Sequence, residues 1–266
     1  MTTGAVDRIS IETVKAYWDA RPCNVRHSRL AVGTREYFDE VEARKYYVEP
    51  HIPGFAQFDR WRGKRVLEVG CGIGTDTINF ARAGAMVTAV DLSTASLALA
   101  RKRAEVFGFA DKIRFFCADA ESLASVVAPE TYDLVYSFGV LHHTPDPARA
   151  IAQIRAFMAD TSEFRMMVYA KNSWKSIMID AGFDQPEAQS GCPIAYTYTR
   201  DEIVRLLAGF KVASIRQDHI FPFVVEKYVK YEYELQPWFA AMPREMFRAL
   251  EASLGWHALV VATLAS

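Results

Sequence analysis

The glycines at positions 70, 72 and 74 are the residues of this sequence whose type and spacing most clearly indicate a binding site. They follow a short apolar run, Arg65–Val69, and precede a segment with a helical pattern, Thr75–Ala83. This order predicts a buried parallel strand, a tight turn and the start of a helix. Glycine is needed where the backbone takes a positive φ or lies against a ligand, and the N–H groups that open the helix point at the turn. The turn therefore predicts a bound small molecule.

Two kinds of cofactor favour such a turn. A dinucleotide site places a third small residue where this chain has Thr75, so the dinucleotide pattern fits poorly. The stretch Arg65–Asp76, R-V-L-E-V-G-C-G-I-G-T-D, instead resembles motif I of the class I S-adenosylmethionine (SAM) methyltransferases, with Glu68 as its leading acid. The resemblance implies SAM as cofactor and S-adenosylhomocysteine (SAH) as product. On this stretch alone, a glycine-rich turn without a ligand remains the alternative.

Two further acids follow predicted strands in the order that the resemblance requires. Asp91 ends the strand Met86–Val90, and Asp119 comes just after the strand Lys112–Cys117. A carboxylate at the first position can accept both hydroxyls of a ribose, and a helix cap is its alternative role. The resemblance implies that Asp119 lies near the adenine amino group and that Ala120 offers a backbone N–H to the ring.

A second specific motif follows the strand Tyr132–Phe138, where the chain reads Y-D-L-V-Y-S-F-G-V-L-H-H. It resembles small-molecule methyltransferases, including the ubiquinone/menaquinone C-methylase-like branch, and dehydrogenases lack it. His142 and His143 are the candidate catalytic bases, because histidine titrates near neutral pH. Bracing of the loop by one of the pair is the alternative. The resemblance covers Arg65–Ala170 well and weakens beyond it.

Strands and helices alternate along the chain, which predicts an α/β protein. The predicted strands are Arg65–Val69, Met86–Val90, Lys112–Cys117, Tyr132–Phe138, Ser162–Tyr169, Phe210–Ile220 and His257–Ala265. The predicted helices are Ser10–Ala20, Thr75–Ala83, Thr94–Phe107, Pro147–Ala159, Ser173–Gly182 and Arg200–Ala208. The resemblance implies a Rossmann-like class I methyltransferase fold, a seven-stranded, mostly parallel sheet with helices on both faces and an antiparallel last strand. Ligands of such sheets bind at the carboxyl ends of the strands.

The chain divides into an N-terminal helical lid segment, 1–64, and a SAM-binding methyltransferase domain, 65–266. The domain carries insertions at about 171–198 and 221–256. The second insertion is too long for a hairpin loop and rich in aromatic residues. We expect it to form a largely helical aromatic cap over the mouth of the site.

Contacts to the cofactor are expected, from the resemblance, at positions around the strand ends and in the lid. They are Tyr17, Glu68, Gly70, Gly72, Gly74, Thr75, Asp91, Leu92, Asp119, Ala120 and Phe138. Contacts to the acceptor are expected at Arg26, His27, Tyr169, Tyr196, Tyr198, Tyr228 and Tyr231. Residues 21–35 carry four arginines and a histidine but no carboxylate, and the functional interpretation of this pattern is capture of an anionic group, either the SAM carboxylate or an acidic acceptor. A solvated basic loop is the alternative.

The composition is that of an ordinary soluble globule, with 51% apolar and 24% charged residues. A net charge of −1 gives no electrostatic reason to expect nucleic acid or an anionic membrane as a partner. No stretch resembles a signal peptide or a membrane span, and the four cysteines lack paired spacing, so a reduced, cytoplasmic protein is expected. Acids and histidines are not grouped at metal-ligand spacing, so no metal site is expected. Oligomeric state leaves no trace in the sequence.

The function that these patterns predict is SAM-dependent methyl transfer to a small molecule, one with an anionic group if the basic loop contacts it. Two alternatives stay open. The first is a SAM-using enzyme of another reaction type on the same fold, including intramolecular attack at the sulfonium. The second is a SAM-binding module without catalysis.

Overall fold

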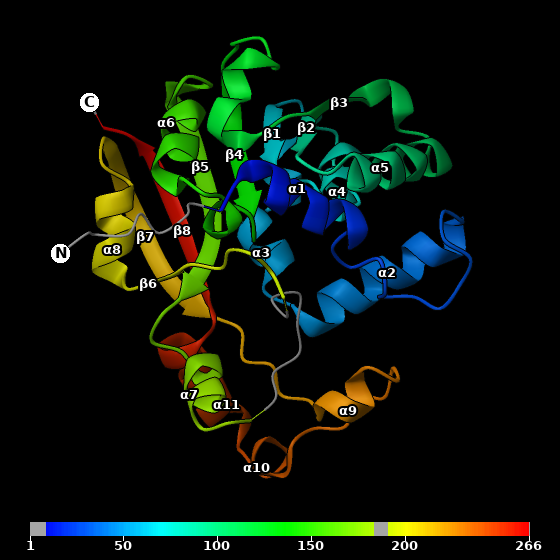
Figure 1. The fold of residues 1–266 in the computed structure, drawn as a ribbon, viewed down its shortest axis with the longest axis vertical. Coiled ribbons are helices and arrows are strands. Elements are labelled where there is room, and N and C mark those ends of the chain that lie inside the picture. Colours follow the sequence, from blue (N-terminus) through cyan, green and yellow to red (C-terminus); the bar gives the residue numbers. More distant parts are fainter. Residues whose placement is uncertain (1–8, 184–190, 266) are drawn as a thin grey trace, which may run out of the picture.

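The computed structural model describes residues 9–183 and 191–265, and a single mixed sheet forms its centre (Figure 1). Seven strands lie in the order β3-β2-β1-β4-β5-β8-β7, and the short strand β6 pairs with β5. The strands are β1 (Arg65–Val69), β2 (Met86–Asp91), β3 (Ile113–Cys117), β4 (Tyr132–Phe138), β5 (Met158–Ala170), β6 (Thr197–Tyr198), β7 (Phe210–Asp218) and β8 (His257–Leu264). The pairs from β3 through β5 are parallel, whereas β8 runs antiparallel to both β5 and β7. This is the Rossmann-like methyltransferase topology expected from the sequence.

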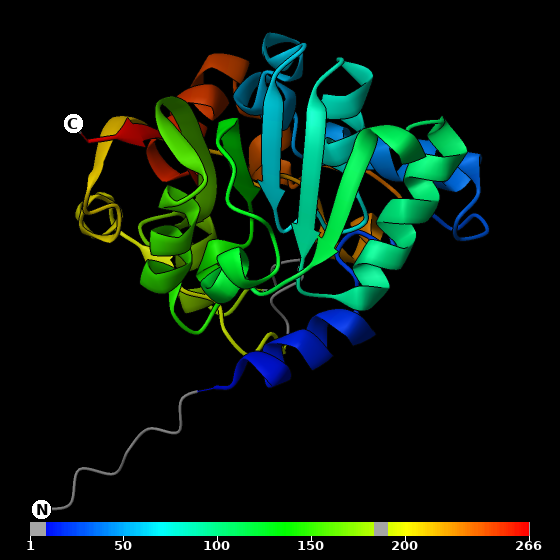
Figure 2. The same ribbon diagram turned by 90° about the horizontal axis from the view of Figure 1, so that it is seen from above.

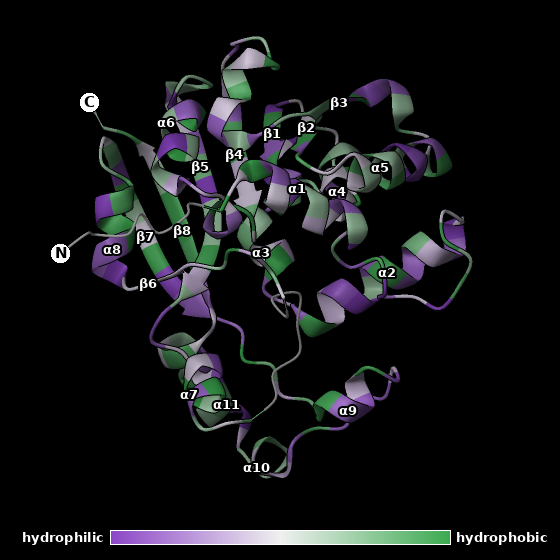
Figure 3. Ribbon diagram, in the orientation of Figure 1, coloured by the Kyte–Doolittle hydropathy of each residue, from purple (hydrophilic) through white to green (hydrophobic). Residues whose placement is uncertain are grey.

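The inner strands are buried on both faces, as their continuous apolar runs require (Figure 3). One core packs α6 (Pro147–Arg155) and α8 (Arg200–Leu206) against the sheet. A second core packs α4 (Thr75–Arg82) and α5 (Thr94–Phe107) against the opposite face. Helices therefore cover both faces, and both ends of the central strands are left for loops.

Three elements of the N-terminal segment pack against this frame: α1 (Ile11–Ala20), α2 (Arg35–Val48) and α3 (Ile52–Ala56). Helix α1 crosses the end of the sheet toward which the strand arrows point (Figure 2). Its Asp19 carboxylate accepts hydrogen bonds from the Ser93 hydroxyl at 2.8 Å and from the backbone N–H of Ala95 at 3.2 Å, at the start of α5. The carboxyl ends of the strands are thus covered by α1, which is held by its last turn.

The segment between β7 and β8 contains three helices and irregular chain. They are α9 (Val225–Tyr228), α10 (Pro237–Ala240) and α11 (Arg244–Leu254), of which α11 packs on β7. The remaining helix is α7 (Trp174–Asp180), and short 3-10 turns lie at Phe58–Trp61, Ala110–Lys112, Ala120–Ser125 and Leu141–His143. Among the described residues, no helix combines the length and the apolar character needed to cross a membrane.

Two expectations about the sheet need correction. The expected count of seven strands misses β6, two residues that pair in parallel with Tyr169 and Ala170 at the end of β5. The expected helix Pro147–Ala159 ends at Arg155, because β5 already begins at Met158. Part of the expected first insertion, 184–190, lies outside the described residues.

Candidate active site

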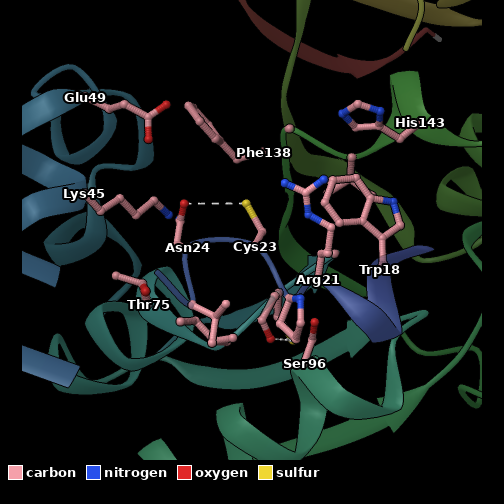
Figure 4. Close-up of a pocket in the computed structure, with 18 of the residues that line it drawn as sticks. Trp18, Arg21, Cys23, Asn24, Lys45, Glu49, Thr75, Ser96, Phe138 and His143 are labelled. Atoms are coloured by element: carbon pink, nitrogen blue, oxygen red, sulfur yellow. Dashed lines mark hydrogen bonds between the residues drawn. The ribbon is translucent and has the colours of Figure 1, made fainter. Parts of the chain in front are cut away.

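A cavity of about 910 Å³ lies at the carboxyl ends of the central strands, beneath α1. Figure 4 shows side chains converging on it from α1 and the following loop, from α2 and from the end of β4. The turn Gly70–Gly74, hereafter the glycine turn, forms part of its lining together with Asp91 and Asp119. The volume lies near the upper end of the range of about 300–1,000 Å³ typical of ligand sites, so a cofactor and a second small molecule have room.

The three glycines of the glycine turn have positive φ angles, but they serve different ends. A Cβ built on Gly70 would lie 2.1 Å from a methyl carbon of Val140, and one on Gly74 would lie 3.1 Å from the Cβ of Ala100 in α5. These two glycines are therefore required by packing. A Cβ on Gly72 would meet no protein atom within 4 Å, and Gly72 lines the cavity. Its missing side chain leaves space that only a ligand can use.

The backbone N–H groups of the glycine turn are largely occupied within the protein. Those of Gly70 and Cys71 both donate to the Val90 carbonyl, at 2.7 and 2.9 Å, and that of Gly74 donates to the Cys71 carbonyl at 2.9 Å. The N–H of Gly72 donates to Asp91 Oδ2 at 2.7 Å. A pyrophosphate would need such groups as donors. The turn offers close backbone approach without an anion cradle.

Asp91 lies at the end of β2 with its carboxylate held by two backbone donors. Oδ2 accepts from Gly72, and Oδ1 accepts from the N–H of Ser93 at 2.8 Å. Burial raises the pKa of Asp91 to about 6, although these hydrogen bonds oppose the shift. Asp119 follows β3 and accepts from the N–H of Glu121 at 2.9 Å, and both it and Ala120 line the cavity.

Glu68 and Asp76 form a pair of buried acids below the glycine turn. Asp76 accepts hydrogen bonds from Lys45 Nζ at 2.6 Å and from the Tyr136 hydroxyl at 3.0 Å. Glu68 accepts from the Thr77 hydroxyl. Burial, together with the Asp76 charge, raises the pKa of Glu68 above its usual range. The pair is short of positive charge, and both carboxylates belong to residues that line the cavity.

The two histidines after β4 differ in position. His143 lines the cavity, and its Nδ1 lies 2.5 Å from the carbonyl oxygen of Ile194. With Nδ1–H as donor to that carbonyl, Nε2 keeps its lone pair, and burial lowers the pKa of His143 to about 4. Trp18 of α1 packs edge-on against it with ring centroids 5.3 Å apart. His142 has no exposed surface and does not line the cavity.

Two arginines of the basic loop, residues 21–35, make hydrogen bonds to the segment between β7 and β8. Arg29 donates to the Lys230 carbonyl at 2.8 Å, and the Tyr231 hydroxyl donates to the Arg26 carbonyl at 2.6 Å. Arg26 and Tyr231 still line the cavity, as do His27, Tyr169 and Tyr228.

Arg44 of α2 is a buried cation in the lining of the cavity that sequence reasoning missed. It is 6% exposed, lines the cavity, and lies over the rings of Tyr228 and Tyr231 at 4.2 and 4.0 Å. Nη2 donates to the Tyr228 carbonyl at 2.8 Å, whereas Nε and Nη1 have no hydrogen-bond partner in the described part of the chain. The signal was its spacing: the buried residues of α2 are Tyr37, Phe38, Val41, Arg44 and Val48. An arginine on the inward stripe of a helix is a candidate ligand contact.

Four side chains that had no expected role gather beyond Phe138: Glu49, His219 and His257, which line the same cavity, and His51, which lies behind them; together they are hereafter the histidine cluster. His51 Nε2 and His257 Nδ1 are 3.0 Å apart, and His257 Nε2 lies 3.7 Å from Glu49 Oε1. The expectation that no histidines and acids are grouped fails here, because the fold joins residues that lie far apart in the sequence.

Most of the expected contact residues do line the cavity, and four do not. Tyr17, Glu68, Gly70, Gly72, Thr75, Asp91, Leu92, Asp119, Ala120 and Phe138 line it on the expected cofactor side. Gly74, His142, Tyr196 and Tyr198 are absent from the lining. Gly74 packs against α5 instead, and Tyr198 pairs in β6 beside β5.

Fold and site together define an open α/β sheet with a ligand cavity at its switch point, where β1 has β2 on one side and β4 on the other. Residues 66–161 match the family described as "Methyltransferase domain". This match confirms, for residues 66–161, the resemblance to methyltransferases stated from the sequence.

Similar proteins include a ubiquinone biosynthesis O-methyltransferase from Aromatoleum aromaticum, 42% identical over 90 residues, which cover 34% of this chain and 37% of that protein. The chain spans between 26% and 42% of the length of the first curated relatives it matches. Among solved structures, magnesium protoporphyrin IX methyltransferase from Synechocystis aligns over 96% of this chain and all of that chain, with a TM-score of 0.64 and 17% identity. Geranyl diphosphate C-methyltransferase from Streptomyces coelicolor aligns over 97% of this chain and all of that chain, with a TM-score of 0.63 and 12% identity. These structural likenesses concern the fold.

Proposed function

We propose that this protein transfers the methyl group of SAM to a small-molecule acceptor that carries an anionic group. The observation that carries the cofactor assignment is Gly72, whose missing Cβ opens onto the cavity beside the Asp91 carboxylate. The N–H groups of the glycine turn are largely hydrogen-bonded within the protein, which disfavours a pyrophosphate and suits a nucleoside cofactor without one.

The residues present fit SAM by the chemistry of their donors and acceptors. Asp91 is placed to accept from the ribose hydroxyls, while Asp119 and Ala120 are the contacts for the adenine. Glu68 and Asp76 supply negative charge for the ammonium group, and their own surplus of negative charge favours a cationic ligand. Tyr17 of α1 is the proposed contact from the lid. SAM supplies an electrophilic methyl group on its sulfonium when bound.

Residues of the protein exclude water from the site and accept the proton of the acceptor. Helix α1, anchored through Asp19, covers the strand ends and excludes water. His143 is neutral at physiological pH, oriented by the Ile194 carbonyl, and accepts a proton from the acceptor at Nε2. We leave His142 without a catalytic role, since its side chain is buried behind the cavity.

The anionic acceptor is supported by Arg44. A guanidinium that is buried, lines the cavity and leaves Nε and Nη1 unpartnered among the described residues has lost hydration without replacing it. A carboxylate or similar anion would satisfy both groups in the bidentate manner that arginine favours. Tyr228 and Tyr231 frame the guanidinium and hold it in place.

The cofactor is tested by calorimetric titration of the purified chain with SAM, SAH and NAD. Saturable binding of the two sulfur compounds without a response to NAD is expected. Binding of NAD, or of neither sulfur compound, would contradict the proposal. Release of SAH rather than methylthioadenosine on turnover separates methyl transfer from other SAM chemistry.

The acceptor class is tested with matched pairs that differ only in a carboxylate, such as 3,4-dihydroxybenzoate and catechol, by following SAH release. Acidic members of a panel should be methylated in preference to their neutral partners. Arg44→Leu should raise the KM for the acidic member at least 10-fold while SAM affinity stays unchanged. Equal turnover of neutral and acidic members, or an unchanged KM in the variant, would refute the anionic acceptor.

A further inference from the structure

The histidine cluster brings metal-ligating atoms together in the lining of the cavity. One ligand atom each from Glu49, His219 and His257 lie within 4.8 Å of one another. Among the described residues, it is the one group of at least three histidine, cysteine, aspartate or glutamate residues whose ligand atoms lie this close together. All three residues line the same cavity as the glycine turn.

The fold constructs this group from three distant elements. Glu49 follows α2 directly, and the antiparallel register pairs Asp218 of β7 with His257 of β8, so that His219 emerges beside His257. His219 has a φ of +72°, uncommon for a residue other than glycine. This conformation is held by a hydrogen bond from its own N–H to Asp218 Oδ1 and another from the Trp256 N–H to its carbonyl, both 2.8 Å. Backbone strain that the surroundings enforce is typical of functional positions.

His51 completes the group from behind. Its Nε2 lies 3.0 Å from His257 Nδ1, on the opposite side of the ring from Glu49. When Nδ1–H of His257 donates to His51, Nε2 of His257 carries a lone pair on the side of Glu49. Metal-ligating histidines are commonly oriented in this way by a hydrogen bond to the other ring nitrogen.

We propose that Glu49, His219 and His257 bind a divalent transition-metal ion of the Fe²⁺–Zn²⁺ series. Two imidazoles and one carboxylate form a donor set that suits these ions, whereas Mg²⁺ and Ca²⁺ prefer oxygen ligands alone. The separation of 3.7 Å between His257 Nε2 and Glu49 Oε1 is close to the ~3.4 Å that tetrahedral bonds of about 2.1 Å imply. The ligand atoms lie within 4.8 Å of one another, so side chains of the group must approach by up to about 1.4 Å to complete the site. Lys45, a nearby cation, is already paired with Asp76.

Three protein ligands leave at least one coordination position open, the arrangement of metal sites that act on a substrate. Because all three ligands line the cavity, an oxygen of the acceptor could occupy that position. The bound ion would then lower the pKa of an acceptor hydroxyl and fix its orientation. This role rests on the proposed function, whereas binding of the ion does not.

The test uses the full chain after treatment with a chelator. Co²⁺ is added and followed by its visible d–d absorption, and Zn²⁺ is then used to displace it. We expect one ion per chain, without the near-ultraviolet bands of thiolate-to-cobalt charge transfer, although the chain has four cysteines. Glu49→Gln, His219→Gln and His257→Gln should each weaken Co²⁺ binding at least 10-fold. His51→Asn should weaken it to a smaller extent, and His142→Gln, a buried histidine outside the cluster, should leave it unchanged.

Absence of saturable Co²⁺ binding, thiolate bands, or equal affinity in the parent and the three ligand variants would overturn the proposal. Circular dichroism checks each variant for folding. Glu49→Gln alone decides if the histidine variants do not fold, because it preserves size at a partly exposed position. SAM affinity is measured on the same samples. If the unsubstituted protein binds SAM but no Co²⁺, the metal site alone is refuted. If it fails to bind SAM, the proposed function alone is refuted.

Discussion

The contact between Gly70 and Val140 gives the sharpest quantitative test of the site geometry. In Gly70→Ala, the new methyl group would lie 2.1 and 2.7 Å from the two methyl carbons of Val140, on a backbone with φ of +85°. A left-handed conformation costs about 1–2 kcal/mol for a residue with a Cβ, and a less flexible unfolded chain returns roughly 0.4–1 kcal/mol. Overpacking adds about 1–3 kcal/mol. The free energy of unfolding should therefore fall by about 2–4 kcal/mol.

The companion substitution separates overpacking from backbone strain. Val140→Ala removes both clashing methyl groups from a half-buried side chain and should cost about 1 kcal/mol by itself. In the double variant the clash is gone and only the strain remains, so the total loss should be about 2 kcal/mol rather than the sum of the single losses. The coupling energy is then about 1–3 kcal/mol, measurable by urea unfolding of the four proteins. Single effects that add to within about 0.5 kcal/mol would refute the proposed contact.

Gly72→Ala is the matched control, because its Cβ meets no protein atom within 4 Å. Its φ of +53° leaves a stability loss of at most about 1 kcal/mol. The methyl group would enter the cavity where the cofactor is proposed to lie. SAM affinity should fall at least 10-fold, or about 1.4 kcal/mol, while Gly70→Ala acts mainly on stability. A Gly72→Ala protein that binds SAM normally would move the cofactor away from this turn.

Further predictions concern three single side chains. Asp91→Ala should weaken SAM binding by about 1.5–3 kcal/mol through loss of a charge-assisted contact, as measured by calorimetry. Because burial raises the pKa of Asp91 to about 6, SAM affinity should rise between about pH 4.5 and 7 as the carboxyl ionises. Over about pH 4 to 6 the contribution of Asp91 to the free energy of unfolding should become less favourable, because the folded state binds more protons there than the unfolded state. A SAM affinity that does not change with pH would contradict the assignment. Asp19→Ala should release the last turn of α1 from Ser93 and accelerate SAM dissociation in stopped-flow experiments, an unchanged rate excluding α1 as the lid. His143→Ala should lower kcat by about 10²–10⁴-fold with SAM affinity intact, and in the parent the pKa of about 4 predicts no loss of activity attributable to His143 above about pH 5.

The elements around the cofactor side could be predicted because their determinants are local. Helix α5 begins and ends where the sequence places it, since Ser93 caps its start and Gly108, with φ of +76°, ends it. The glycine turn and Asp91 are predictable for the same reason, because a parallel strand, a turn and a helix follow one another within a few residues. Strand β6 escaped prediction because two residues carry no periodic pattern and owe their conformation to pairing with β5.

The histidine cluster depended on long-range register. The sequence predicts two antiparallel final strands, which brings the end of one near the start of the other. Opposing positions cannot be counted from the strand ends, however, because the ladder shifts between Val212 and Ser214. Glu49 and His51 come from a third element whose docking no motif specifies. A role for Arg44 could have been predicted, since it falls on the buried side of its helix. The sequence patterns instead favoured the exposed arginines of the neighbouring loop.

The charges of the residues that line the cavity indicate the polarity of its ligands. Below the glycine turn, burial holds the pKa values of Glu68 and Asp91 above their ordinary range, because negative charge there lacks a sufficient counter-charge. At α2 the imbalance is opposite, with Arg44 buried and two of its nitrogen groups unpartnered among the described residues. A cationic nucleoside relieves the first imbalance and an anionic acceptor the second. A net charge of −1 conceals this separation, since it sums over the whole chain. Under the proposed function, binding of both molecules should therefore stabilise the protein, because each supplies a charge that is unmatched in the folded chain.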